Sequence, residues 1–132
     1  MIIKTAEELQ DLIQRVLLAA GADERNAGVV AEHLVSANLC GVDTHGVYHL
    51  QGYVDSVRQG LIIPATWPET TIDKPNAAQV RGHWTFGHTS ARCAMELCLQ
   101  KAETNDMACV SLVEANHIGR LGYYVEMATE RR

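Results

Sequence analysis

The chain has 132 residues and a formal net charge of −5, and 47% of its residues are hydrophobic and 20% charged. This composition is typical of an ordinary globular domain. The sequence has no basic run that would bind nucleic acid, and no stretch approaches the roughly 20 apolar residues of a membrane span. The residues after Met1 lack the apolar stretch of a signal peptide. We therefore expect a cytoplasmic protein with no nucleic-acid partner and no membrane partner.

Two helices that suggest no chemistry open the chain. Residues 5–8 form a capping box, in which a hydroxyl and a carboxylate three residues later bind free backbone N–H groups. Apolar residues then recur at helical spacing until Gly21. A second helix begins at Ala22 or Asp23 and ends at Gly41. We expect both helices to pack in the core.

The third predicted helix follows Asp43 and Thr44, either of which can cap it, and runs to about Gly60. Its side chains fall into two stripes at the helical spacing of about 100° per residue. The packed stripe consists of Val47, Leu50, Val54 and Val57, and the stripe of polar rings consists of His45, His49 and Tyr53. The second stripe suits the wall of a cleft.

His45 lies at the start of this predicted helix. The partial positive charge there would keep the imidazole neutral and able to exchange a proton with an alcohol or carbonyl oxygen. Two other interpretations remain open. His45 can be a surface residue at a helix end, or it can form part of a zinc site with His49, although the Glu of a His-Glu-x-x-His motif and a third ligand are missing.

The composition changes near residues 62–68, where we place the boundary between an N-terminal helical subdomain (1–61) and the truncated start of an α/β domain (62–132). The second part follows a β-α-β-α pattern that contains a compact apolar strand of the kind buried in a sheet. Its strands are expected at residues 70–72, 78–80 and 107–113, and its helices at 89–104 and 123–132. Two good strands are too few for a covered sheet, so we interpret the chain as an N-terminal fragment.

The turn after the apolar strand carries the second candidate histidine. His117 lies at the carboxyl end of a predicted parallel strand, where ligands gather in α/β proteins, although a lone histidine in such a turn can also be structural. Arg120 either binds a carboxylate of a ligand or pairs with a helix charge. We expect His33 to be a partly buried core residue, and His83 and His88 to flank a turn.

The cysteines are irregularly spaced and include no Cys-x-x-Cys pair of the kind found in zinc ribbons or thioredoxins. Each has apolar neighbours, which favours buried free thiols in a reducing compartment. They are Cys40, Cys93, Cys98 and Cys109.

Several motifs, in this order along the chain, resemble the malate/L-lactate dehydrogenase family of type 2. They are Asp43-Thr44-His45-Gly46 with Leu50 and Tyr53, Gly60-Leu61-Ile62 with Pro64, Gly82 through Phe86-Gly87-His88, Ala94-Met95, and Asn116-His117-Ile118-Gly119-Arg120-Leu121-Gly122-Tyr123-Tyr124. The last motif is the most specific, and the likeness covers essentially the whole chain. The family also contains ureidoglycolate, sulfolactate, diketogulonate and hydroxycarboxylate dehydrogenases.

The resemblance implies an NAD- or NADP-dependent oxidoreductase that interconverts a small 2-hydroxy acid, such as malate or lactate, and its 2-oxo acid, generally as a homodimer. It also implies the N-terminal part of the sulfolactate dehydrogenase-like α/β fold instead of a Rossmann fold, which agrees with the missing Gly-x-Gly-x-x-Gly loop. The candidate residues are His45 and His117 for catalysis, Thr44, His49, Tyr53 and Arg120 for the substrate, and His117 and Gly119 for the cofactor. No metal site is expected.

The sequence departs from the family in two respects. Many members have an arginine where this chain has His49, and histidine cannot bind a carboxylate through the same two-pronged contact. Members are also considerably longer, with further nucleotide-binding segments and an active-site lysine, so we expect this chain alone to be inactive or barely active. Two other hypotheses remain, a non-catalytic helical dimerisation module and a metal-dependent hydrolase.

Overall fold

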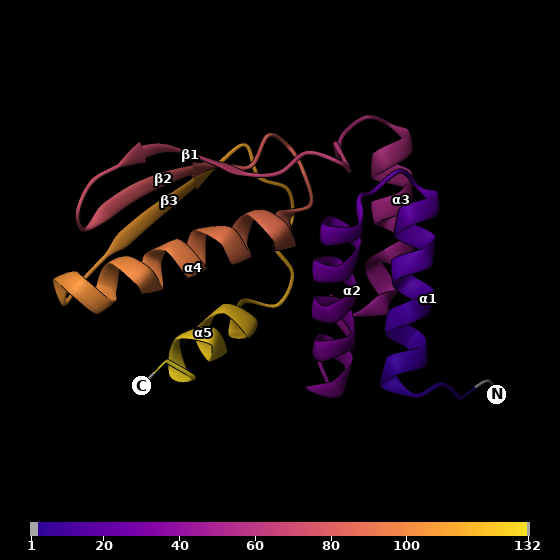
Figure 1. Cartoon of the computed structure of the whole chain (residues 1–132). Coiled ribbons are helices and arrows are strands. Elements are labelled where there is room, and N and C mark those ends of the chain that lie inside the picture. Colours follow the sequence, from indigo (N-terminus) through magenta and orange to yellow (C-terminus); the bar gives the residue numbers. More distant parts are fainter. Residues whose placement is uncertain (1–2, 132) are drawn as a thin grey trace.

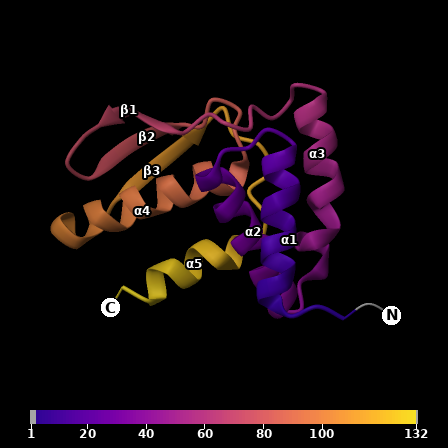
Figure 2. The ribbon, with the colours of Figure 1, turned by 45° about the vertical axis from the view of Figure 1, so that its right-hand side comes forward.

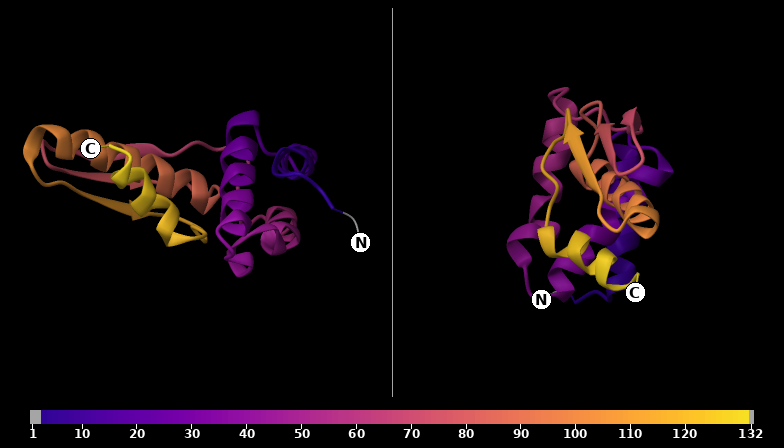
Figure 3. Two further views of the ribbon diagram at one scale, coloured as in Figure 1. Left: turned by 90° about the horizontal axis from the view of Figure 1, so that it is seen from below. Right: turned by 90° about the vertical axis from the view of Figure 1, so that its left-hand side faces the viewer.

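The three N-terminal helices lie at one end of the computed structural model, and the strands lie with the other two helices at the opposite end; the structure describes residues 3–131 (Figure 1). One end, named the helical end below, consists of α1 (Ala6–Ala19), α2 (Glu24–Leu39) and α3 (Leu50–Arg58). The other, named the strand end, consists of β1 (Glu69–Asp73), β2 (Ala77–Arg81), α4 (Gly87–Asn105), β3 (Cys109–Val113) and α5 (Leu121–Thr129). Seen from below, α2 lies between the other N-terminal helices and the strand end (Figure 3). Between residues 3 and 131, no helix is both long and apolar enough to cross a membrane.

The first two helices begin where the sequence predicts. Glu8 donates its backbone N–H to the Thr5 hydroxyl over 3.2 Å, and its carboxylate accepts from the Thr5 N–H over 2.8 Å. The capping box is therefore confirmed. Asp23 caps α2 by accepting from the Asn26 N–H over 2.8 Å.

The third helix begins later than predicted, at Leu50. Two short 3₁₀ turns, Asp43–His45 and Val47–His49, precede it, and neither Asp43 nor Thr44 caps a helix. The cause is Asn38 on α2, whose amide group donates to the Asp43 carboxylate and accepts from the Val47 N–H over 2.9 Å. The predicted effect of a helix N-terminus on His45 therefore has no basis in the structure.

The three strands form one sheet in the order β1-β2-β3. β1 and β2 are an antiparallel hairpin, whereas β2 and β3 are parallel and joined by the crossover helix α4. Helix α4 runs along one face of the sheet, and α5 lies on the far side of α4 from the sheet (Figures 1 and 2). The predicted order of helices followed by a β-α-β-α unit is confirmed.

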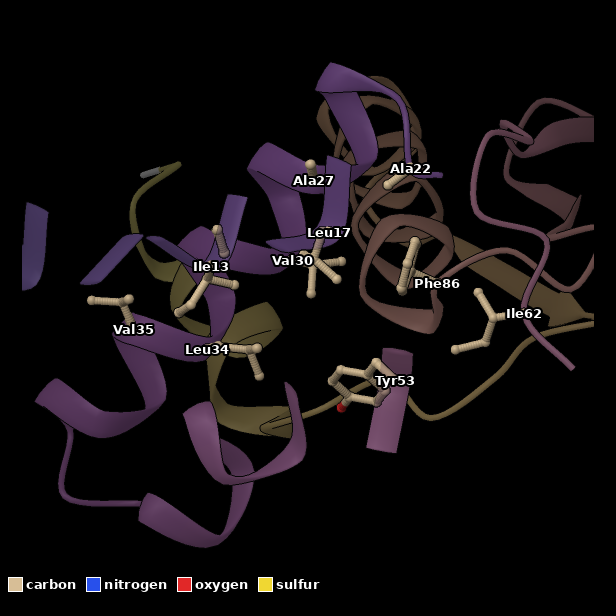
Figure 4. Close-up of a cluster of buried hydrophobic side chains, with 11 residues drawn as sticks. Ile13, Leu17, Ala22, Ala27, Val30, Leu34, Val35, Tyr53, Ile62 and Phe86 are labelled. Carbon is tan, nitrogen blue, oxygen red and sulfur yellow. The ribbon is translucent and has the colours of Figure 1, made fainter. Parts of the chain in front are cut away.

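A buried hydrophobic cluster joins the helical end to the strand end (Figure 4). It consists of Ile13, Leu17, Ala22, Ala27, Val30, Ala31, Leu34, Val35, Tyr53, Ile62 and Phe86. Most members come from α1 and α2, but Ile62 and Phe86 follow the predicted boundary at residue 61. The helical end therefore shares its core with the segment that leads into α4.

Two predictions of burial are wrong. β3 has no fully buried residue, because it lies at the edge of the described sheet, and Met107 before it is 75% exposed. The cysteines are free, but Cys40 and Cys109 are exposed, and Cys93 and Cys98 are half-buried. Apolar neighbours in the sequence did not indicate burial here, because Cys40 follows α2 at a helix end and Cys109 lies on the exposed strand.

Candidate active site

Three histidine rings meet where the helical end contacts the strand end. His45 and His49 come from the two 3₁₀ turns, and His117 comes from the turn after β3. The ring centroid of His117 lies 5.9 Å from that of His45 and 5.2 Å from that of His49. His117 is exposed and the other two rings are half-buried. These three rings, named the histidine face below, can contact a small ligand together.

The turn that carries His117 is held by Asn116. The Asn116 amide donates to the carbonyl oxygens of Trp84 and Thr85, over 2.8 and 3.0 Å. Gly87 permits this close approach, since a Cβ there would collide with the backbone of Asn116 and His117. The start of α4 and the turn after β3 are thus fixed to each other, which sets the position of the His117 ring.

Tyr53 connects the histidine face to the interior. Its hydroxyl lies 2.9 Å from His117 Nδ1 and 3.4 Å from His88 Nε2. His88 is 1% exposed, and its ring is 4.7 Å from that of His33, which is equally buried. His33 Nε2 in turn accepts from the Arg120 N–H over 2.9 Å. A continuous row of rings therefore leads from the surface to α2.

The environment of these rings favours their neutral forms. Burial is the main cause that lowers the pKa of His33 to about 4 and the pKa of His88 well below its usual value. The pKa of His117 is also lowered, first by partial burial and then by repulsion from His49 and His45. Burial raises the pKa of Tyr53, so its hydroxyl keeps its proton. At neutral pH the row from His117 to His33 therefore consists of uncharged groups.

The other candidate residues lie around this row. Thr44 is exposed, with its hydroxyl 3.1 Å from His45 Nδ1. Gly119 has a φ of +76°, and a Cβ there would collide with the rings of His33 and His88. The backbone at Gly119 therefore closes the inner end of the row.

Arg120 is engaged by its own chain. Its guanidinium donates to both carboxylate oxygens of Glu126 over 2.7 and 2.6 Å. The Arg120 side chain is 11% exposed, and one nitrogen also lies 3.5 Å from the Ser36 hydroxyl. Of the two interpretations left open by the sequence, the ion pair favours the helix-pairing charge.

Sequence reasoning did not assign His88 and His33 to the site. His88 was expected only to flank a turn; it lies in the first turn of α4 and is buried. One signal could have found it, because His88 follows β2 as His117 follows β3, and the carboxyl ends of parallel strands share one edge. Within residues 3–131, no group of three or more His, Cys, Asp or Glu side chains is arranged to hold a metal ion.

Comparison with known proteins gives a consistent result. A family model described as malate/L-lactate dehydrogenase matches residues 4–132. Hydroxycarboxylate dehydrogenase B of Escherichia coli (strain K12) is 37% identical over 121 residues, which cover 92% of this chain and 34% of the relative. L-sulfolactate dehydrogenase of Methanothermobacter thermautotrophicus is 34% identical over 124 residues, which cover 92% of this chain and 36% of the relative.

Solved structures agree with the sequences. The sulfolactate dehydrogenase of Methanocaldococcus jannaschii superposes with a TM-score of 0.94 at 31% identity, covering 98% of this chain and 38% of the other. The malate dehydrogenase of Pyrococcus horikoshii gives a TM-score of 0.93 at 33% identity, covering 98% and 37%. The predicted sulfolactate dehydrogenase-like fold is thus confirmed. The chain spans about a third of the length of these relatives.

Proposed function

Because the chain belongs to the malate/L-lactate dehydrogenase family, we propose that it forms one wall of the active site of a nicotinamide-dependent oxidoreductase. The reaction is the interconversion of a small 2-hydroxy acid, such as malate or lactate, and its 2-oxo acid, with NAD or NADP. The observation that supports this proposal is the histidine face, where His45, His49 and His117 meet. Rings of this kind can exchange a proton with the substrate oxygen.

The described residues fit the reactive end of such a cofactor. The histidine face is open and lined by flat rings, and His117 and Gly119 lie in the turn after a parallel strand, where α/β proteins hold ligands. The fit does not extend to the phosphates, because the Arg120 guanidinium in this turn is neutralised by Glu126. We therefore assign only the nicotinamide end to this wall.

In the reductive direction, a bound reduced nicotinamide would supply the hydride that reduces C2 of the 2-oxo acid, and the carbonyl oxygen would then need a proton. A histidine of the face supplies the proton that completes the hydroxyl group, and we assign this role to His45 or His117. Thr44 and Tyr53 line the substrate side. We assign His49 as the partner of the substrate carboxylate because it occupies the position where many family members have arginine. Histidine is shorter and titratable, so it binds the carboxylate through a single contact.

We test this proposal in the complete protein that carries the chain, by following the absorbance of the reduced nicotinamide with pyruvate and oxaloacetate and with either cofactor. His45→Gln or His117→Phe should lower the turnover by about 10²–10⁴-fold, the usual contribution of a proton-transfer group. His83→Asn is the matched control, because His83 lies outside the face and has a φ of +50°, which asparagine tolerates.

Failure of the complete protein to reduce any 2-oxo acid with either cofactor would contradict the proposal. The 132-residue chain alone should show no robust turnover, because it spans about a third of its relatives. A homodimer in the cytoplasm is part of the same proposal, and size-exclusion chromatography with light scattering tests the dimer. A dimer of the complete protein that shows no turnover would favour the alternative of a non-catalytic dimerisation module.

A further inference from the structure

We propose that Tyr53, supported by His88, is a positioning residue that holds neutral His117 in the tautomer with its proton on Nε2. This inference rests on the proposed function of the histidine face, and it assigns different roles to His117 and His45. His117 then orients and polarises the substrate carbonyl through an N–H donor, and proton transfer belongs to His45. The proposal follows from the direction of two hydrogen bonds at one hydroxyl group.

The Tyr53 hydroxyl has one proton and two nitrogen neighbours, His117 Nδ1 at 2.9 Å and His88 Nε2 at 3.4 Å. Two arrangements satisfy both contacts. In the outward arrangement, His88 Nε2–H donates to the Tyr53 oxygen and the Tyr53 O–H donates to His117 Nδ1. In the inward arrangement, His117 Nδ1–H donates to Tyr53 and the Tyr53 O–H donates to His88. The two arrangements put the proton of neutral His117 on opposite ring nitrogens.

The burial of His88 decides between them. His88 is 1% exposed, and its Nδ1 has no hydrogen-bond partner among the described residues. The inward arrangement places a proton on this Nδ1 and so buries an N–H group without an acceptor. The outward arrangement leaves only an unused lone pair there. Orphaned buried N–H groups are the rarer defect in proteins, so the outward arrangement is favoured.

This direction defines what His117 presents to a ligand. Nδ1 faces Tyr53, so Nε2 lies on the opposite edge of an exposed ring. A neutral ring with an N–H at Nε2 can donate a hydrogen bond to a carbonyl oxygen, but giving up that proton would leave an imidazolate anion. Neutral imidazoles polarise carbonyl groups in this way in other enzymes. The proton must then come from the other ring of the proposed pair, His45, which donates it as an imidazolium and is left as the neutral imidazole; its Nδ1 is 3.1 Å from the Thr44 hydroxyl.

The first test reads the tautomer directly. Long-range ¹H–¹⁵N correlation spectra of the uniformly ¹⁵N-labelled chain distinguish protonated from unprotonated ring nitrogens of each neutral histidine. At a pH where His117 is neutral, we expect Nε2 to be protonated and Nδ1 to be of the acceptor type. An Nδ1–H tautomer of His117 would overturn the proposal, and this measurement needs no variant.

The second test uses the sign of a pKa change at His117, a ring whose ionisable neighbours are His45, His49, Tyr53 and His88. A hydrogen bond donated to Nδ1 favours the neutral ring, so Tyr53→Phe should raise the pKa of His117. One lost hydrogen bond corresponds to about half to one pH unit. The inward arrangement predicts the opposite sign, because there Tyr53 accepts from the protonated ring. A fall in the pKa would therefore overturn the proposal.

The role of His88 is tested by a pair of substitutions with a matched control. In His88→Gln, the side-chain amide supplies an N–H near the position of Nε2 and should preserve the His117 tautomer. His88→Phe supplies no donor and should yield a mixture of tautomers. His83→Asn should leave the spectrum of His117 unchanged. If His88→Phe keeps a single Nε2–H tautomer, His88 is not a positioning residue.

Activity separates this inference from the proposed function. In the complete protein, His117→Gln retains an N–H donor and should lose at least tenfold less turnover than His45→Gln. Equal losses would contradict the division of labour. A complete protein that reduces no 2-oxo acid would instead contradict the proposed function, while the tautomer of His117 would still report the Tyr53 contact.

Discussion

The helical end and the strand end of this chain bury their side chains very differently. Helix α2 contributes eight buried residues, whereas all five residues of β1 are exposed, β3 has no buried residue, and burial in the strand end is concentrated in β2 and the first turns of α4. The helical end closes its own core with help from Ile62 and Phe86. In the strand end, α4 covers one face of the sheet, and large side chains such as Ile72 and Met107 are exposed.

This difference explains where the histidine face lies. The rings come from both ends, and the buried side of the contact is the core cluster, in which Tyr53 (Figure 4) is 6% exposed. The turn after β3 brings His117 to that side through the contacts of Asn116. A hydrogen bond from Tyr53 to His117 can therefore fix a ring that is itself exposed. The following predictions test the contrast between the two ends.

The largest effect is expected from Phe86→Ala. Phe86 is 1% exposed within the core cluster, and removing a buried aromatic ring costs about 3–5 kcal/mol. The matched change in the strand end is Ile72→Ala, at a residue 46% exposed, where we expect no more than about 1 kcal/mol. Urea denaturation followed by circular dichroism measures both. Comparable losses would show that the strand end depends on packing as strongly as the helical end does.

A somewhat smaller effect is expected from Gly119→Ala, at the contact between the two ends. Gly119 and Gly41 have similar positive φ angles, +76° and +73°, so alanine is strained by about 1–2 kcal/mol at either position. A Cβ at Gly119 also collides with His33 and His88, whereas a Cβ at Gly41 has no neighbour within 4 Å. The loss of stability should therefore be larger for Gly119→Ala by at least about 1 kcal/mol. Equal losses would mean that the turn moves freely away from α2.

Acid should weaken the same contact. The pKa of His33 falls to about 4 in the folded chain, mainly through burial, from an ordinary value of 6.5. The unfolded chain then binds the proton more readily, so the contribution of neutral His33 is complete above about pH 6.5 and declines as the pH falls towards 4. Between pH 6.5 and pH 5 the decline is about 2 kcal/mol, and protonation of His88 acts in the same direction.

Urea titrations at several pH values measure this decline. His33→Gln keeps a side-chain acceptor for the Arg120 N–H but does not titrate, so it should flatten the pH dependence of the free energy of unfolding. A slope as steep as that of the unsubstituted chain would show that His33 does not contribute, and would leave His88 as the main source of acid sensitivity.

These residues also show what the sequence can and cannot predict. Local signals succeeded, since the capping box of α1 and the crossover from β2 to β3 depend on neighbouring residues or on hydrophobic spacing. The predicted start of α3 was wrong because Asn38, on another helix, binds Asp43, one of the residues expected to cap it, and the Val47 N–H. His88 was missed for a related reason: its burial depends on the approach of Gly119, which lies 31 positions later in the sequence.

The His45, His49 and Tyr53 stripe illustrates the same limit from the other side. The four-residue spacing predicted that these rings are neighbours, and they are, although the segment is not one regular helix. Two 3₁₀ turns replace the first part of the predicted helix, and they still place His45 beside His49 and His49 beside Tyr53. The proximity of His117 to Tyr53 had no local signal, because 64 positions separate them. The family motifs supplied that information at the level of the sequence.

The smallest loss of stability is expected from substitutions at exposed threonines, one in the capping box of α1 and one in β1. Thr5→Ala removes the side-chain acceptor of the α1 capping box at an exposed position, so it should cost about 1 kcal/mol although it alters no core side chain. Thr70→Ala is its counterpart in the strand end, where Thr70 is exposed on β1, and should cost no more than about 0.5 kcal/mol. Thermal unfolding at matched concentrations measures the difference. Because α1 packs on α2, a loss confined to α1 still reaches the core cluster through Ile13 and Leu17. Equal costs at Thr5 and Thr70 would mean that the end of α1 frays without affecting the core, and the helical end would then be stabilised by its buried interior alone.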